Sequence, residues 1–222
     1  MKIHILAVTP AYNKFCIAGM TEDGEWVRPI PGHGLNRFWT EEELNFNSYG
    51  FLRPGDVLNI QGNRPAKYKF PNHTEDFLVN EYNFHKRPTN QQLITFLQGK
   101  EESQSNLTNT LKGAQRSLCL IKVDEFTHYR NDYNPEKVKP RVHLYSNILQ
   151  VGNIKVENES YILKDCKWIP YVLQDNLPLN DFENIYIAIG LATKTSYDQV
   201  EYPQIIGIHT DPGLNIQSTY PY

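Results

Sequence analysis

The sequence lacks most of the features that would announce a function directly. Its 222 residues include only three cysteines, Cys16, Cys119 and Cys166, and no CxxC pair. We therefore expect buried, reduced thiols and no cysteine-based metal site. No apolar run approaches the roughly 18 residues that a membrane-spanning helix needs. The short apolar stretch after Met1 lacks a convincing cleavage site, so we expect a cytoplasmic protein that does not enter a membrane.

An excess of charge of one sign is also missing. The chain has 22 Lys and Arg against 25 Asp and Glu, which gives a formal net charge of -3. Bulk positive charge, which drives nucleic-acid binding by histone-like chains, is therefore excluded, whereas a local basic groove is not. Hydrophobic residues make up 40% of the chain and the mean hydropathy is -0.55, values that indicate a folded rather than a disordered protein.

Motifs for catalysis, metal binding and phosphate binding are absent as well. The seven histidines form no HxH or HExxH pattern, and the sequence contains no GxSxG, GxGxxG or GxxxxGKS motif. We expect no metal, no cofactor and no catalytic residue. Adjacent carboxylates do occur at Glu75-Asp76 and Asp124-Glu125, and we interpret them as solvated strand edges. A hydrolase built from such scattered carboxylates is a third, weaker hypothesis that the sequence leaves open.

Short strands dominate what the sequence does contain. About ten segments are rich in β-branched or aromatic residues and are bounded by turn residues. Asp23-Gly24 predicts a hairpin turn, since both positions accept a positive φ. The number and spacing of the segments predict an all-β protein with minor helices, built as barrels or sandwiches. The predicted strands are Ile3–Thr9, Phe15–Thr21, Trp26–Pro29, Val57–Gln61, Phe77–Tyr82, Leu118–Phe126, Arg141–Val151, Glu159–Lys164, Ile185–Ala192 and Tyr202–His209.

Two capping-box patterns predict the helices. Thr40–Glu43 predicts a short helical turn, and Thr89–Gln92 predicts a helix that runs to about Gln98 and stops at Gly99. The polar stretch that follows, Lys100–Ser117, is the best candidate for a boundary. It divides the chain into halves of about 100 residues, a size that suits small β-barrels.

Basic residues interleaved with aromatic residues are the main binding signal. Alternation in an extended segment would put Lys67 and Lys69 on one face and Tyr68 on the other. Arg141 and Tyr145 form a similar mixture in the second half. Cations suit phosphates and flat rings suit unstacked bases, so these clusters favour single-stranded or irregular nucleic acid. Half-buried strand aromatics beside solubilising lysines are the structural alternative.

The segment Glu25–Pro29 holds the most distinctive pair, Trp26 and Arg28. Strand alternation predicts that both side chains lie on one face, with Val27 on the other. Together they could stack a base and hold a phosphate. Equally, Trp26 could cover a barrel end while Arg28 satisfies loop carbonyls, and the sequence does not decide between these two roles.

Several blocks resemble the bacterial dual OB-containing domain family. The specific ones are Cys16–Gly19, Gly24–Pro29 and Pro54–Leu58, at the start of the chain. The resemblance implies two OB-like antiparallel β-barrels in tandem. With the boundary placed at the polar stretch, we expect a first barrel with a short C-terminal helix (residues 1–100), a polar linker or insertion (101–117) and a second barrel (118–222). It also implies nucleic-acid sensing in bacterial or phage conflict (defence) systems, without a catalytic residue. Broadly compatible blocks are Arg141–Tyr145, Tyr161–Asp165, Ile187–Leu191 and Ile205–Ile208.

These observations favour a non-catalytic module that binds single-stranded or irregular DNA or RNA, alone or as an accessory or sensor. The alternative is a protein–protein module that docks on a larger partner through a tyrosine-rich barrel surface, since the chain has 14 tyrosines. In a nucleic-acid-binding module, the cations would hold phosphates and the aromatic rings would stack bases. The predicted nucleic-acid-binding residues are Trp26, Arg28, Lys67, Tyr68, Lys69, Arg141 and Tyr145.

Overall fold

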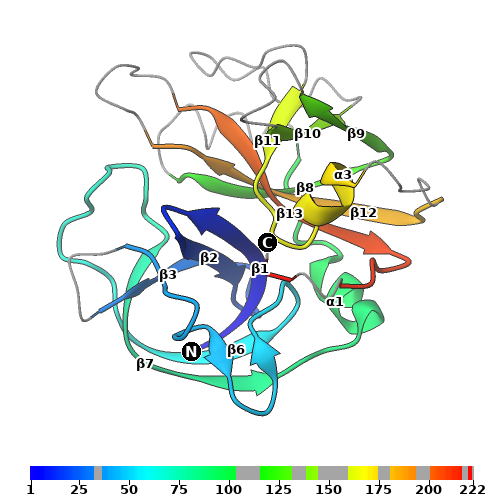
Figure 1. Cartoon of the computed structure of the whole chain (residues 1–222). Coiled ribbons are helices and arrows are strands. Elements are labelled where there is room, and N and C mark those ends of the chain that lie inside the picture. The colour runs from blue at the N-terminus through cyan, green and yellow to red at the C-terminus, as the bar shows by residue number, and fades with distance from the viewer. Residues whose placement is uncertain are drawn as a thin grey trace.

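A computed structural model of the chain is mostly β, as predicted (Figure 1). It describes residues 1–32, 37–103, 116–131, 139–144, 160–174, 181–193, 201–216 and 220–221. Within these ranges the strands form two units, one from each half of the chain. No helix in these ranges has the length and apolar character needed to cross a membrane.

The first unit is a closed barrel of five strands in the order β1-β2-β3-β7-β6. β3 and β7 pair in parallel, and the other neighbours are antiparallel. This five-stranded, closed arrangement is that of an OB-fold. Its strands are β1 (Lys2–Ala11), β2 (Lys14–Met20), β3 (Trp26–Pro31), β6 (Val57–Asn63) and β7 (Asp76–Lys86).

The predicted hairpin between β2 and β3 is present. Gly24 has a φ of +84°, and the Thr21 amide donates to the Glu25 carbonyl at 2.9 Å. The turn predicted at Thr40–Glu43 is present, with its capping box, but it does not form a helix: the Thr40 amide donates to the Glu43 carboxylate at 2.7 Å, and the Leu44 amide donates to the Glu41 carbonyl at 3.2 Å. The segment remains a turn because the chain enters an unpredicted hairpin of β4 (Asn45–Phe46) and β5 (Gly50–Phe51) directly afterwards.

Helix α1 (Asn90–Leu97) confirms the second capping box. The Thr89 hydroxyl accepts from the Gln92 amide, and the Gln92 side chain accepts from the Thr89 amide at 2.9 Å. Gly99 follows the helix with a φ of +75°. The helix buries Leu93, Ile94, Phe96 and Leu97 in the cluster between the two units.

The second unit is a six-stranded sheet in the order β8-β12-β13-β11-β10-β9. The single strand predicted at Leu118–Phe126 is wrong, since the chain breaks at Asp124 and Glu125 into two strands. One half pairs with β12 and the other with β10. The strands are β8 (Leu118–Val123), β9 (Phe126–Asn131), β10 (Lys139–Leu144), β11 (Ser160–Leu163), β12 (Asn184–Leu191) and β13 (Pro203–Asp211).

Both units share one strand plan. In the first unit, β1 pairs with β6 at its start and with β2 over the rest of its length. In the second unit, β8 pairs with β12 and β9 pairs with β10, so these two strands together take the place of β1. β11 and β13 pair in parallel, like β3 and β7. A short helix, α3 (Ile169–Leu173), packs against the core of the second unit. The second unit is therefore a second OB-like barrel whose first strand is split.

A third apolar cluster joins the two barrel cores. It combines Leu6 of β1 and the buried face of α1 with Leu120 and Ile206 of the second unit. Backbone contacts reinforce it, since the Cys166 amide donates to the Val8 carbonyl at 3.0 Å. The barrels therefore pack face to face with little freedom to separate.

Candidate functional site

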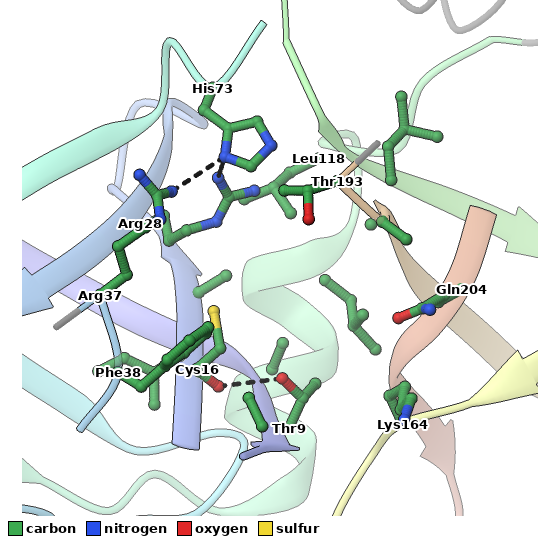
Figure 2. Close-up of a pocket in the computed structure, with 18 of the residues that line it drawn as sticks. Thr9, Cys16, Arg28, Arg37, Phe38, His73, Leu118, Lys164, Thr193 and Gln204 are labelled. Carbon is green, nitrogen blue, oxygen red and sulfur yellow. Dashed lines mark hydrogen bonds between the residues drawn. The ribbon is translucent and has the colours of Figure 1, made fainter. Parts of the chain in front are cut away.

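A cavity of about 610 Å³ lies between the two barrels, and we call it the inter-barrel pocket (Figure 2). Thr9 and Cys16 form part of the wall from the first barrel, and Lys164 and Gln204 face them from the second. Ile206, which belongs to the joining cluster, also lines it. The pocket therefore exists only because the two barrels are packed together.

The charged side chains that line the inter-barrel pocket in the described ranges are all cationic: Arg28, Arg37, Lys69 and Lys164. Within the part of the chain that the structure describes, no Asp or Glu lines it. Within the described ranges neither lysine takes part in an ion pair. Burial, followed by the nearby charge of Lys139, lowers the pKa of Lys164. A ligand with negative charge is the natural counterpart of this lining.

Aromatic rings accompany these cations. Tyr12 is 89% exposed in the β1–β2 turn, and its ring centroid lies 5.7 Å from that of Phe38. Phe70 lies beneath the Arg37 guanidinium, with 5.2 Å between Cζ and the ring centroid. All three rings line the inter-barrel pocket. The pocket thus offers flat apolar faces beside positive charge.

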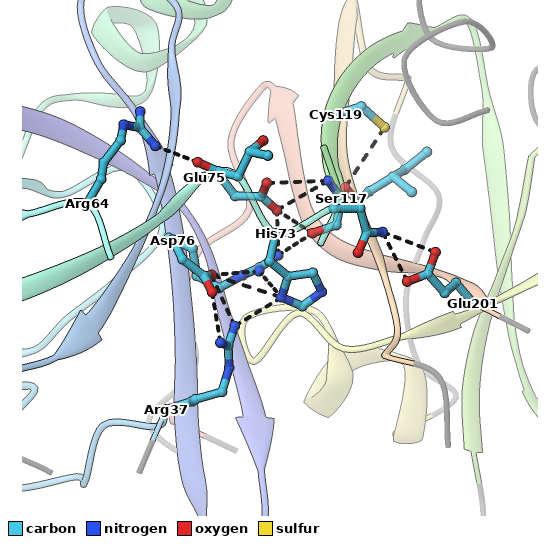
Figure 3. A network of polar contacts seen from close by, with 12 residues as sticks. Arg37, Arg64, His73, Glu75, Asp76, Ser117, Cys119 and Glu201 are labelled. Carbon is cyan, nitrogen blue, oxygen red and sulfur yellow. Dashed lines mark hydrogen bonds and ion pairs between the residues drawn. The ribbon is translucent and has the colours of Figure 1, made fainter. Parts of the chain in front are cut away.

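Behind the two arginines lies a buried polar network (Figure 3). Arg28 donates to Glu75 at 2.8 Å and to Asp76 at 3.0 Å, and Arg37 pairs with Asp76 at 2.8 Å. Arg28 also donates to the Ser117 hydroxyl of the second unit at 2.6 Å. Two guanidinium groups thus balance two carboxylates, so the net positive charge of the pocket comes from its lysines.

The interpretation of Glu75-Asp76 as a solvated strand edge is wrong. Glu75 is 2% exposed and Asp76 is 1% exposed. Carboxylates at this depth need paired cations, which Arg28 and Arg37 supply. Their partners lie far away along the chain, so adjacent carboxylates alone could not reveal the network.

His73 completes the network and is held in one tautomer. Its Nδ1 lies 2.6 Å from Arg28 Nη1 and 3.0 Å from Arg37 Nη2. Because arginine is always protonated, Nδ1 accepts both hydrogen bonds and the ring proton lies on Nε2. Burial, and then the charges of the two arginines, lower the pKa of His73 to about 2. Nε2 is buried and has no hydrogen-bond partner in the described part of the chain.

Trp26 and Arg28 do share one face of β3, as alternation predicted, while Val27 points into the core of the first barrel. The face is not open to solvent, however. Trp26 is 2% exposed and packs in the joining cluster, so it offers no surface on which a base could stack. Arg28 is 6% exposed and holds internal carboxylates. The second barrel covers this face, and the sequence pattern does not encode its position.

The segment with Lys67, Tyr68 and Lys69 is a loop between β6 and β7 rather than an extended strand. The predicted alternation of faces is therefore wrong. Lys69 and Phe70 both line the inter-barrel pocket, whereas Lys67 and Tyr68 do not. Tyr145 falls outside the described residues.

Arg141 lies in a line of cross-strand neighbours that leads out of the pocket. Its Nε donates to the Ser160 hydroxyl at 2.6 Å, and the same hydroxyl bonds to Tyr129, which is 42% exposed. Lys139 and Lys164 lie two residues from members of this line and so share its face. We call it the cross-strand row: Leu118, Gly190, Gln204, Ile162, Arg141 and Tyr129. Its first three members line the pocket, so the pocket and Arg141 lie on one surface.

The shared strand plan has a counterpart among known families. The model of the dual OB-containing domain matches residues 1–202. The chain belongs to the dual OB-containing domain family. A comparison with curated proteins found no match.

In OB-folds, the loops between strands 1 and 2 and between strands 4 and 5 bind oligonucleotides, together with the face of strands 2 and 3. In the first barrel of this dual OB-containing protein these loops carry Tyr12 and Lys69. In the second barrel, β10 and β11 are the second and third strands, and Thr193 begins the loop after β12. The two loops of the first barrel and the loop after β12 all contribute residues to the inter-barrel pocket.

Sequence reasoning missed Arg37, His73 and Lys164. Each is a single polar residue whose neighbours in the sequence gave no signal, and each reaches the pocket only through the fold. The search for metal ligands gives a separate result: within the described ranges, no group of three or more His, Cys, Asp or Glu side chains is placed to hold an ion.

Proposed function

We propose that this chain is a non-catalytic module that binds single-stranded DNA or RNA through the inter-barrel pocket and the cross-strand row. One observation carries the proposal: among the residues that the structure describes, every charged side chain lining the pocket is cationic, and aromatic rings accompany these cations. Single-stranded nucleic acid requires this combination of phosphate contacts and stacking platforms.

The proposed contacts divide between the two surfaces. Lys69 and Lys164 approach from opposite barrels and neutralise phosphates inside the pocket. The rings of Tyr12 and Phe38 stack bases at the pocket, where each stacked base contributes about 1–3 kcal/mol. Tyr129 and Arg141 extend the surface across the second barrel. Trp26 has no place in this set because it is buried.

Within the cell, we propose a cytoplasmic accessory or sensor that recognises nucleic acid in a bacterial or phage conflict system. The family supports this role, since its OB-folds are a common scaffold for oligonucleotide binding. No catalytic residue enters the proposal.

A protein partner is the second candidate, and the exposed tyrosines favour it. Tyr12 is 89% exposed, Tyr49 is 53% exposed and Tyr129 is 42% exposed. Tyrosine gives large contact area at small entropic cost in protein interfaces. Two of these residues, however, lie at the cationic pocket and row, where a polyanion is the better match. Recovery of one stoichiometric protein partner without nucleic acid would favour this candidate.

The salt dependence of binding tests the proposal. A double variant, Lys69→Gln with Lys164→Gln, removes two phosphate contacts. The slope of log affinity against log salt should become shallower by about 1.4, at about 0.7 for each single-strand contact. Fluorescence anisotropy with labelled single-stranded DNA and RNA measures this slope.

Lys2→Gln is the matched control. Lys2 is exposed at the far end of β1, away from the pocket residue Thr9. It should leave the slope unchanged. Failure of the unmodified protein to bind either nucleic acid at low salt would overturn the proposal, as would identical slopes for the double variant and the unmodified protein.

A further inference from the structure

The inter-barrel pocket is flanked on two sides by contacts that cross from one barrel to the other. On one side, Arg28 donates to Ser117 at 2.6 Å, and the Asn72 amide donates to both Glu201 oxygens at 3.0 Å. On the other side, the Cys166 amide donates to the Val8 carbonyl at 3.0 Å. These contacts hold the two barrels together beside the pocket.

The floor of the pocket is closed. Ala18, Leu118 and Ile206 line the pocket and also belong to the apolar cluster that joins the barrels. The cavity of about 610 Å³ lies within the range of roughly 300–1,000 Å³ that holds one small-molecule-sized group. One nucleotide fits a cavity of this size.

We infer that the inter-barrel pocket receives the terminal nucleotide of a single strand, so that the protein recognises nucleic-acid ends. The inference rests on the proposed function and specifies its ligand. The nucleotides that follow the end leave through the mouth of the pocket and lie along the cross-strand row towards Arg141 and Tyr129.

Two polar features of the pocket fit an end group in particular. A terminal phosphate monoester carries a charge of about -1.5 to -2 at pH 7, more than an internal diester, and so gains more from Lys69 and Lys164. His73 adds the buried Nε2–H that lacks a partner in the described structure, on the side of the ring away from both arginines (Figure 2). A phosphate or base oxygen could satisfy this donor after a shift of the ring, since Nε2 is buried in the free chain.

A comparison of linear with circular oligonucleotides tests whether the protein recognises the end of a strand. Anisotropy competition would compare single-stranded oligonucleotides of one sequence and length in four forms: 5′-phosphorylated, 3′-phosphorylated, unphosphorylated and circular. We expect one phosphorylated linear form to bind about tenfold or more tightly than the circle, a difference of about 1.4 kcal/mol. Equal affinity for the circle and every linear form would overturn the inference while leaving the proposed function intact.

A variant at the rim of the pocket distinguishes the contribution of the pocket to binding from that of the cross-strand row. Thr193 lines the pocket and is exposed, so Thr193→Trp can narrow the cavity without disturbing a core. This variant should lose the preference for linear strands and should bind them as weakly as the circle. A retained preference would overturn the inference, as would equally tight binding of a free mononucleotide. Absence of binding to all forms would instead overturn the proposed function.

Discussion

Arg28 is a buried side chain that contacts groups in both barrels. Its guanidinium group contacts Glu75, Asp76 and His73 in the first barrel and Ser117 in the second. All five side chains are nearly or fully excluded from solvent. A buried ion pair adds little net stability compared with an apolar pair, but an unpaired buried charge is costly.

Arg28→Met should therefore destabilise the protein strongly, because Glu75 would remain buried without its cation. We expect the free energy of unfolding to fall by about 3–5 kcal/mol. Urea denaturation followed by tryptophan fluorescence measures the change.

Arg64→Met provides the comparison. Arg64 pairs with Glu25 at the surface, where both side chains are substantially exposed. Surface ion pairs contribute about 0–1 kcal/mol, so this variant should remain within about 1 kcal/mol of the unmodified protein. Similar losses in the two variants would contradict the structural role assigned to Arg28.

For single residues, the sequence predicted the direction of side chains along a strand better than it predicted their burial. The alternation of Trp26, Val27 and Arg28 is correct, because strand periodicity is a property of the local backbone. The predicted role for Trp26 did not follow, because the second barrel covers that face. Lys69 was predicted and lines the pocket, but Lys164, its counterpart across the pocket, was missed.

At the scale of elements, the two capping boxes show what a local motif can decide. Both form their hydrogen bonds, yet only the one at Thr89 starts a helix. Its box is followed by Leu93, Ile94 and Leu97, which bury one helical face. The box at Thr40 is followed by a single buried Leu44 and then by a strand. Tertiary burial, rather than the cap, determines which box extends.

The split first strand of the second barrel lay beyond sequence reasoning for a similar reason. Most other predicted strands in the described ranges are observed close to their expected positions. At Leu118–Phe126, however, a continuous apolar pattern crosses Asp124 and Glu125, where the chain changes partner from β12 to β10. Pairing partners are set by closure of the whole barrel, which a local pattern does not carry.

At the scale of the whole molecule, the two barrels are joined through buried groups whose protonation differs between the folded and unfolded states. His209 Nε2 lies 3.0 Å from the Leu6 carbonyl across the joint between the barrels. Burial, and then the charge of Lys167, lower the pKa of His209 to about 3. Burial raises the pKa of Asp165, in the same region, to about 6.

These shifts predict acid sensitivity. Below about pH 6.5 the unfolded chain protonates its histidines while folded His209 stays neutral, so stability falls as pH decreases towards 3, by up to about 1.4 kcal/mol per pH unit. Asp165 acts in the opposite direction between about pH 6 and 4, because only the folded state keeps its proton there. His73 adds a second contribution with the same sign as His209.

His209→Gln isolates the effect of one histidine, since glutamine can still donate to Leu6 but does not titrate. Between pH 6 and 4, the slope of unfolding free energy against pH should be smaller in this variant by about 1.4 kcal/mol per pH unit. Denaturant titrations at a series of pH values measure both slopes. Parallel pH profiles for the variant and the unmodified protein would contradict the assignment.

The location of the binding site can be tested with the cysteines that the chain already has. Cys16 lines the inter-barrel pocket and is half-buried, whereas Cys119 and Cys166 are fully buried. Burial raises the pKa of Cys16, so its alkylation should be slow at neutral pH and faster in alkaline buffer.

The most direct measurement is the alkylation rate of Cys16, followed by mass spectrometry, with and without a saturating single-stranded oligonucleotide. If nucleic acid occupies the inter-barrel pocket, the bound oligonucleotide should slow alkylation of Cys16 by about tenfold or more, a difference of about 1.4 kcal/mol in accessibility. An unchanged rate, with binding confirmed in the same sample, would contradict a binding site between the barrels.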